Sequence, residues 1–143
     1  WDPYARGAIL GLTRGVNKFH IVRATLESLA FQTSDVLQVM EQDSGIHMSS
    51  LKVDGGASRN NFLMQFQADM IGTPVRRPAC VETTALGASC LAGLAAGFWE
   101  TPEELVRNQE LDREFTPSMD VTGREEHLRG WKQAVGAIRG WAQ

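Results

Sequence analysis

The longest regular pattern of apolar residues predicts a helix that begins after Asn17. Apolar or small residues recur at alternating spacings of four and three, so they share one helix face. These residues are Val22, Leu26, Leu29, Thr33, Val36 and Met40. Asn17 can cap the start of this helix, and Gly45 suits its end. We therefore expect one long helix between these two residues.

A strand, a helix and a second strand are predicted next. Leu51–Asp54 alternates apolar and polar positions, as half-buried strands do, and Thr73–Arg77 is a second short strand. Ser58 or Asn60 can cap the helix between them, and Gly72 would stop it. The apolar face of this helix would carry Phe62, Phe66 and Met70.

Three further helices are predicted in the second half of the chain. Thr84 opens the segment "ALGASCLAGLAAGFW", whose small residues suit close packing in a core. Thr101 and Glu104 have the spacing of a capping box, with proline at the first helical position. Thr122 and Glu125 repeat that spacing before the last helix.

Strands that alternate with helices indicate an α/β fold class with a thin, mostly parallel sheet and packed helices. Besides the two strands, only the extended run Ala8–Leu12 is a candidate for a third. So thin a sheet, in a chain that begins at Trp1 without Met, predicts a segment of a longer protein whose upstream part completes the sheet. We expect the isolated piece to be marginally stable or prone to aggregation, because its strand edges would be exposed.

Composition narrows the possible partners. The 143 residues are 43% hydrophobic and 22% charged, which is typical of a globular domain. A net charge of −3 argues against a general nucleic-acid-binding surface. No apolar run approaches the ~18 residues of a membrane span. Cys80 and Cys90 are too few for a structural zinc site, and free thiols fit a reducing cytoplasm.

The segment Asp54-Gly55-Gly56 is the strongest candidate for a binding site. It lies where the first predicted strand passes into a helix, and such strand ends and helix N-termini bind anions and nucleotides. Glycine has no Cβ, so the backbone can lie against a ligand, while Asn60 offers a donor and an acceptor. A plain turn in which glycine supplies a positive φ is the alternative, and the pattern alone leaves both open.

Residues for catalysis are not evident. The glycine pair is neither a Gly-x-Gly-x-x-Gly motif nor a P-loop. The chain shows no paired carboxylates, no metal-ligand spacing and no nucleophile next to a base, and its histidines are scattered. We therefore predict no catalytic and no metal-binding residue within this chain, which looks like half of a binding site.

Two longer motifs resemble the carboxyl-terminal part of the FGGY carbohydrate kinases. The first 33 residues, "WDPYARGAILGLTRGVNKFHIVRATLESLAFQT", are similar to the second signature of that family. The matching positions are Gly7, Ile9, Gly11, Leu12, His20, Ile21, Ala24, Leu26 and Glu27. The segment "VDGGASRNNFLMQFQADMIGTPVRRP" resembles the family's adenosine motif. The resemblance covers the chain up to about Pro117, and its opening residues point to members that act on glycerol.

The resemblance implies a ribonuclease H-like (actin-type ATPase) domain and transfer of the γ-phosphate of ATP to glycerol, giving glycerol 3-phosphate. It implies that Gly56 and Asn60 contact the adenosine side of ATP, and that Gly55 and Ala57 shape the same turn. Residues 1–117 would be the nucleotide-side subdomain, incomplete at its N-terminal side, and residues 118–143 a C-terminal helix.

The resemblance also implies the cofactors and partners. These are ATP or ADP, glycerol, Mg²⁺ held mainly by the missing part, and further copies of the chain in a homo-oligomer. The catalytic Asp of the family lies upstream, so this segment alone should be inactive. Another sugar or polyol kinase of the family, or a non-catalytic actin-like module, remains an alternative.

Overall fold

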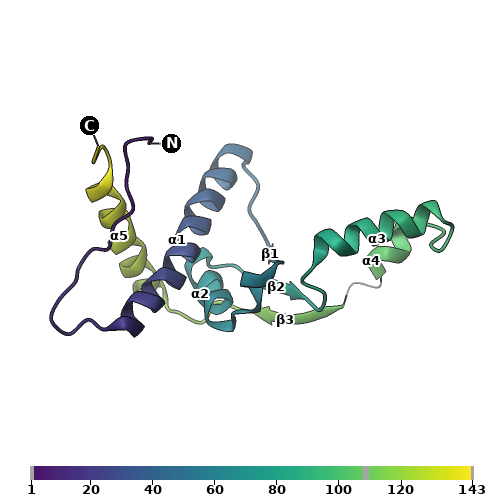
Figure 1. The fold of residues 1–143 in the computed structure, drawn as a ribbon, viewed down its shortest axis with the longest axis horizontal. Helices are drawn as coiled ribbons and strands as arrows, with labels where there is room; N and C mark the ends of the chain where they lie inside the picture. Colours follow the sequence, from purple (N-terminus) through teal and green to yellow (C-terminus); the bar gives the residue numbers. More distant parts are fainter. Residues whose placement is uncertain (1, 108–109, 143) are drawn as a thin grey trace.

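The computed structural model describes residues 2–107 and 110–142 (Figure 1). Trp1, which opens the first motif, lies outside this description, as do residues 108–109 and 143. The elements in chain order are α1 (Lys18–Ser44), β1 (Leu51–Lys52), the 3₁₀ helix η1 (Gly56–Arg59), α2 (Asn61–Ile71), β2 (Val75–Pro78), α3 (Thr83–Ala95), α4 (Pro102–Arg107), β3 (Leu111–Phe115) and α5 (Val121–Ile138).

The ends of α1 are those predicted. The side chain of Asn17 accepts a hydrogen bond of 2.9 Å from the N–H of Phe19. The His20 ring accepts one of 3.2 Å from the N–H of Asn17, which completes a capping box. Gly45 closes the helix at φ +68°, where its N–H donates to the carbonyl of Glu41.

The buried face of α1 is not the one with the regular apolar spacing. Ala30 and Phe31 are buried against α2. Val22, Val36 and Met40, which belong to the predicted face, are each 59% exposed. Leu26 and Thr33 of that face are half-buried, so the second apolar face of the helix is largely, but not wholly, exposed.

The sheet has three strands in the order β1-β2-β3. β1 and β2 are parallel, with Leu51 opposite Val75, so the α/β class and the parallel pair are confirmed. β3 is antiparallel to β2, with Phe115 opposite Val75, and the sheet is therefore mixed. Ala8–Leu12 is not a strand, and β3 takes the third place instead. Its sequence, LDREF, lacks apolar alternation. Two of its charged residues, Asp112 and Glu114, form ion pairs with Arg77 and Arg76 of β2.

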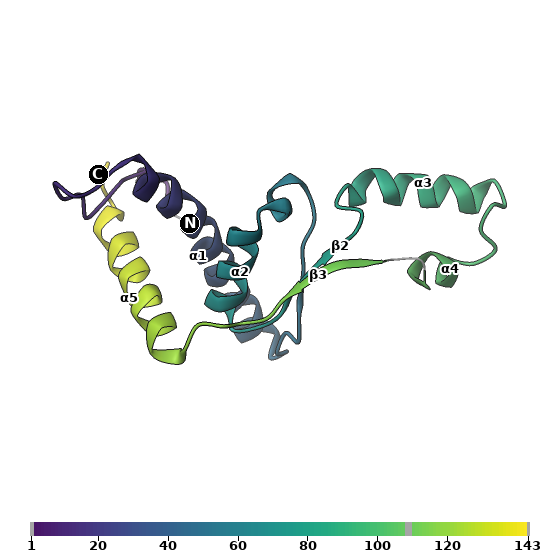
Figure 2. The same ribbon diagram turned by 90° about the horizontal axis from the view of Figure 1, so that it is seen from below.

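The core lies where α2 packs between α1 and the sheet (Figure 2). The rings of Phe31 and Phe66 meet edge to face with centroids 5.4 Å apart. Leu128 and Trp131 of α5 are partly buried and pack against this core. The buried residues of the cluster are Ala30, Phe31, Leu63, Met64, Phe66, Ala68, Met70, Val75 and Phe115.

Helices α3 and α4 extend away from this core (Figures 1 and 2). The prediction that α3 packs closely in a core is wrong for this structure, because none of its residues is buried. One glycine of α3 does allow a close approach: a Cβ at Gly93 would lie 2.7 Å from the indole of Trp99. The helix begins at Thr83, one residue before Thr84.

The capping boxes predicted for the last two helices do not form as expected, although α4 does begin at Pro102, directly after Thr101. At α4, Glu104 accepts a hydrogen bond of 3.0 Å from the N–H of Glu100, and not from Thr101. At α5, Asp120 is the N-cap, and its side chain accepts a hydrogen bond of 2.8 Å from the N–H of Gly123. The predicted box of Thr122 and Glu125 is therefore wrong, because aspartate is at least as good an N-cap as threonine and precedes it.

Candidate functional site

The segment Gly55–Asn60, which we call the glycine turn, joins β1 to α2. Gly55 has φ +75° and ψ 176°, a conformation that is essentially restricted to glycine. Its N–H donates to the carbonyl of Val81 over 2.8 Å. Its carbonyl accepts from the N–H and the hydroxyl of Ser58, at 3.2 and 2.7 Å. The conformation of the backbone thus explains the first glycine of the pair.

The second glycine has no such explanation. Gly56 does not have a positive φ, and a Cβ at this position would meet nothing within 4 Å. Gly56 and Ala57 are both exposed, whereas Ser58 is buried at 1%. The glycine turn therefore has one side fixed to the protein and one open side on which the backbone is accessible.

Asn60 is the N-cap of α2, so the alternative cap, Ser58, is excluded. The side-chain oxygen of Asn60 accepts a hydrogen bond of 3.1 Å from the N–H of Leu63. This capping bond uses the acceptor and leaves the side-chain amide NH₂ as the donor for a ligand. The structure thus brings Gly55, Gly56, Ala57 and Asn60 together within one short turn.

Asp54 is hydrogen-bonded to the start of α3. Its carboxylate accepts a hydrogen bond from the hydroxyl of Thr83, the first residue of α3, and not from amides of the glycine turn. Asp54 therefore connects the end of β1 to the start of α3. Across residues 2–107 and 110–142, no group of three or more His, Cys, Asp or Glu side chains is placed to hold a metal ion.

A cavity of about 580 Å³ opens between the sheet and the start of α3. Lys52, Asp54, Thr83 and Glu110 are among its lining residues, as is Cys80, which like Cys90 is a free thiol. None of the four predicted binding residues lines this cavity.

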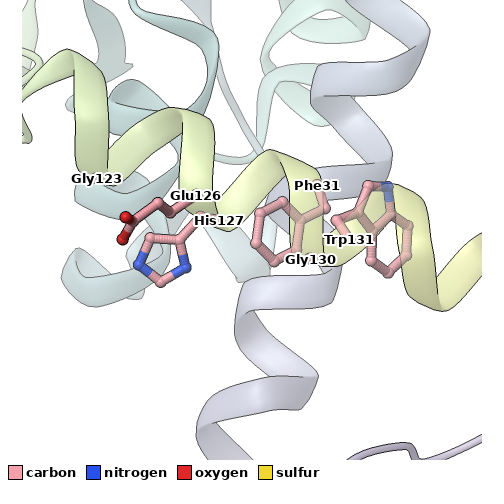
Figure 3. A pocket seen from close by; sticks show the side chains of 6 residues that line it. All are labelled: Phe31, Gly123, Glu126, His127, Gly130 and Trp131. Carbon is pink, nitrogen blue, oxygen red and sulfur yellow. The ribbon is translucent and has the colours of Figure 1, made fainter.

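A second, more open cavity of about 410 Å³ lies on α5 beside α1 (Figure 3). Figure 3 shows Phe31 between the rings of His127 and Trp131. Phe31 and Trp131 stack with centroids 5.3 Å apart, and the indole N–H donates to Asp35 over 2.7 Å. Trp131 is therefore a packing residue.

Arg77 reaches the glycine turn from β2 and was not predicted. Its guanidinium donates to the carbonyl of Ser58 at 2.7 Å and to the side chain of Asn61 at 2.9 Å. These contacts span 19 and 16 positions in the chain, so no local pattern signals them.

Sequence comparison gives close relatives over the whole chain. A protein named glycerol kinase from Caldanaerobacter subterraneus subsp. tengcongensis is 61% identical over all 143 residues, and one from Fusobacterium nucleatum is 60% identical. The similarity thus continues past Pro117, where the resemblance was expected to weaken. The chain spans 29% of the length of these relatives.

None of the helices that the structure describes is both long enough and apolar enough to cross a membrane.

Solved structures show the same fold. A Plasmodium falciparum glycerol kinase with ADP superposes with a TM-score of 0.81 at 35% identity, over 94% of this chain and 27% of that one. A xylulose kinase from Rhodospirillum rubrum superposes with a TM-score of 0.74 at 23% identity, over 96% of this chain and 28% of that one. At this identity, the likeness supports the fold alone. The expected ribonuclease H-like, actin-type fold is thereby confirmed. Residues 1–96 match the C-terminal domain of the FGGY family of carbohydrate kinases, and the chain therefore belongs to that family.

Proposed function

We propose that this chain is the carboxyl-terminal part of a glycerol kinase, which phosphorylates glycerol to glycerol 3-phosphate with ATP. The observation that carries the proposal is about 60% identity, over every residue of the chain, to proteins named glycerol kinase. The chain corresponds to 29% of those proteins, so the activity belongs to the full-length enzyme and the segment alone is inactive.

Within that enzyme, the glycine turn binds the adenosine side of ATP. Gly56 supports this assignment, because nothing in the described structure requires a glycine there and its backbone is open to an approaching ligand. The amide NH₂ of Asn60 is the second contact, and Gly55 and Ala57 give the turn its shape. The Plasmodium falciparum relative was solved with ADP, which agrees with a nucleotide ligand.

Phosphoryl transfer depends mainly on positioning and on stabilisation of charge. When bound, ATP would supply the phosphoryl group and Mg²⁺ would help to offset its negative charge. The glycine turn orients the adenosine end of the nucleotide. The part of the enzyme outside this chain provides the base that takes the glycerol proton and the ligands of Mg²⁺.

The test uses the full-length enzyme that contains this chain. ATP-dependent phosphorylation is measured for glycerol and for a panel that includes xylulose and gluconate. We expect kcat/KM to be highest for glycerol. A higher kcat/KM for another polyol or sugar would assign the chain to a different member of the family. No turnover of any substrate, with weak or no ATP binding, would indicate the non-catalytic module.

Two further properties belong to the same proposal. We expect the full-length enzyme to be cytoplasmic and to form a homo-oligomer. Light scattering coupled to size-exclusion chromatography measures the number of copies, and a monomer at micromolar concentration would contradict the second expectation.

A further inference from the structure

We infer that Arg77 is a positioning residue for the nucleotide. It acts by fixing the glycine turn, without touching the ligand itself. The inference rests on the proposed function, because it assigns a partner to the turn proposed to bind adenosine.

The contacts of Arg77 reach both sides of Asn60. Its Nη1 donates to the carbonyl of Ser58 at 2.7 Å and to Oδ1 of Asn61 at 2.9 Å. Ser58 precedes Asn60 by two residues, and Asn61 follows it directly. One guanidinium therefore fixes the backbone before Asn60 and the first residue of α2 after it.

Arg77 is itself held rigidly. Its side chain is only 11% exposed, and its Nε donates to Asp112 of β3 at 2.7 Å. The guanidinium carbon lies 5.3 Å from the centre of the ring of Phe115, within the range of a cation–π contact. A half-buried arginine with its donors directed in a fixed fork is well suited to hold another segment in place.

The glycine turn is thus fixed at two points on its inner side. Gly55 is tied to Val81 at the start of the turn, and Ser58 is tied to Arg77 in its second half. Gly56 and Ala57, between these two points, remain exposed. Positioned backbone atoms next to an open surface bind a ligand with less loss of conformational entropy, so loss of the Arg77 contacts should weaken nucleotide binding.

Arg76 provides a matched control. It is the neighbouring residue on the same strand, it carries the same charge, and it also pairs with an acidic residue of β3, Glu114, at 2.5 Å. It makes no hydrogen bond to the glycine turn among the described residues. Arg76→Lys therefore reproduces the chemical change at a site that does not hold the turn.

The experiment compares Arg77→Lys with Arg76→Lys in the full-length enzyme. Lysine keeps the charge but cannot donate in the same fork to Asp112 and to the glycine turn. We expect Arg77→Lys to raise KM for ATP by about tenfold, the scale of one lost hydrogen bond to a charged group, with KM for glycerol and kcat nearly unchanged. Arg76→Lys should leave all three parameters at their wild-type values.

A second variant covers the case in which Arg77→Lys fails to fold. Asn61→Ala removes one of the two contacts and leaves Arg77 paired with Asp112. It should raise KM for ATP by about threefold and lower the melting temperature only slightly, because Arg77 keeps its bonds to Ser58 and Asp112. Wild-type KM for ATP in a folded Arg77→Lys would overturn the inference, as would an equal rise in Arg76→Lys. If Arg77→Lys does not fold, wild-type KM for ATP in Asn61→Ala overturns it.

Failure of the inference and failure of the proposed function give different results. If the wild-type enzyme does not phosphorylate glycerol, the proposed function fails, and titration with ADP still measures the effect of Arg77 on nucleotide affinity. If the wild-type enzyme phosphorylates glycerol and the variants keep its KM for ATP, only the role of Arg77 is refuted. A wild-type protein that binds no ADP refutes both.

Discussion

Asp69 of α2 accepts a hydrogen bond of 2.6 Å from the backbone N–H of Ser118, 49 positions further along the chain. The same oxygen accepts from the N–H of Met119 at 3.2 Å and from the side-chain amide of Gln65 at 3.1 Å. Asp69 is only 7% exposed. One buried carboxylate thus fixes the connection between β3 and α5 to the central helix.

Replacement of this carboxylate should lower stability. In Asp69→Ala, the N–H groups of Ser118 and Met119 lose their acceptor, and such a loss costs about 1–3 kcal/mol. We expect a lower melting temperature of the full-length protein. Asp43→Ala, which removes an exposed carboxylate of α1, is the control and should leave the melting temperature unchanged.

The two glycines of the turn should respond differently to alanine. Gly55→Ala places a Cβ on a residue with φ +75°, a strain of about 1–3 kcal/mol, so the melting temperature should fall. Gly56→Ala adds a Cβ with no described atom within 4 Å, and the residue does not have a positive φ. The melting temperature should therefore stay unchanged while KM for ATP rises. An unchanged KM for ATP in Gly56→Ala would show that the open side of the turn is not in contact with nucleotide.

Two phenylalanines one turn apart on α2 form another matched pair. Phe66 is 4% exposed and contacts Phe31, whereas Phe62 is 39% exposed and stacks on Phe66 from outside. Phe66→Ala should cost about 3–5 kcal/mol, as is usual for a large buried side chain, and lower the melting temperature far more than Phe62→Ala. Equal losses would mean that Phe62 is also buried in the full-length protein.

A carboxylate near the start of the chain should give a small dependence of stability on pH. Hydrogen bonds from the N–H groups of Gly140 and Tyr4 to Asp2 lower the pKa of its carboxyl below the ordinary 3.8. The stabilisation is therefore present above pH 3.8 and is lost as the pH falls through the lowered pKa. The melting temperature of the wild type should therefore exceed that of Asp2→Asn above pH 3.8. This difference should shrink as the pH falls from 3.8 through the lowered pKa of Asp2.

Features set by neighbouring residues could be predicted from the sequence. The caps of α1 and α2, the stop at Gly72 and the parallel pair of strands depend on local patterns, and the structure contains them. The position of the glycine turn follows from the same local reasoning. β3 could not be predicted, because Asp112, Arg113 and Glu114 interrupt its apolar alternation.

Other features depend on contacts that no local pattern encodes. Arg77 meets the glycine turn only because β2 lies beside β1 in the sheet, so its role requires the tertiary structure. The regular apolar spacing on α1 identified a face but not its partner. In this structure, Val22 and Met40 of that face are exposed, and Phe31 on an adjacent face contacts the core instead.

The position of α3 and α4 in the chain has a structural consequence. Because β2 and β3 are adjacent and antiparallel, α3 and α4 stand in the connection between two neighbouring strands of the sheet. Val81 and Thr83, at the base of this connection, are bonded to Gly55 and Asp54. These hydrogen bonds join the start of α3 directly to the end of β1 and to the backbone that we propose holds adenosine.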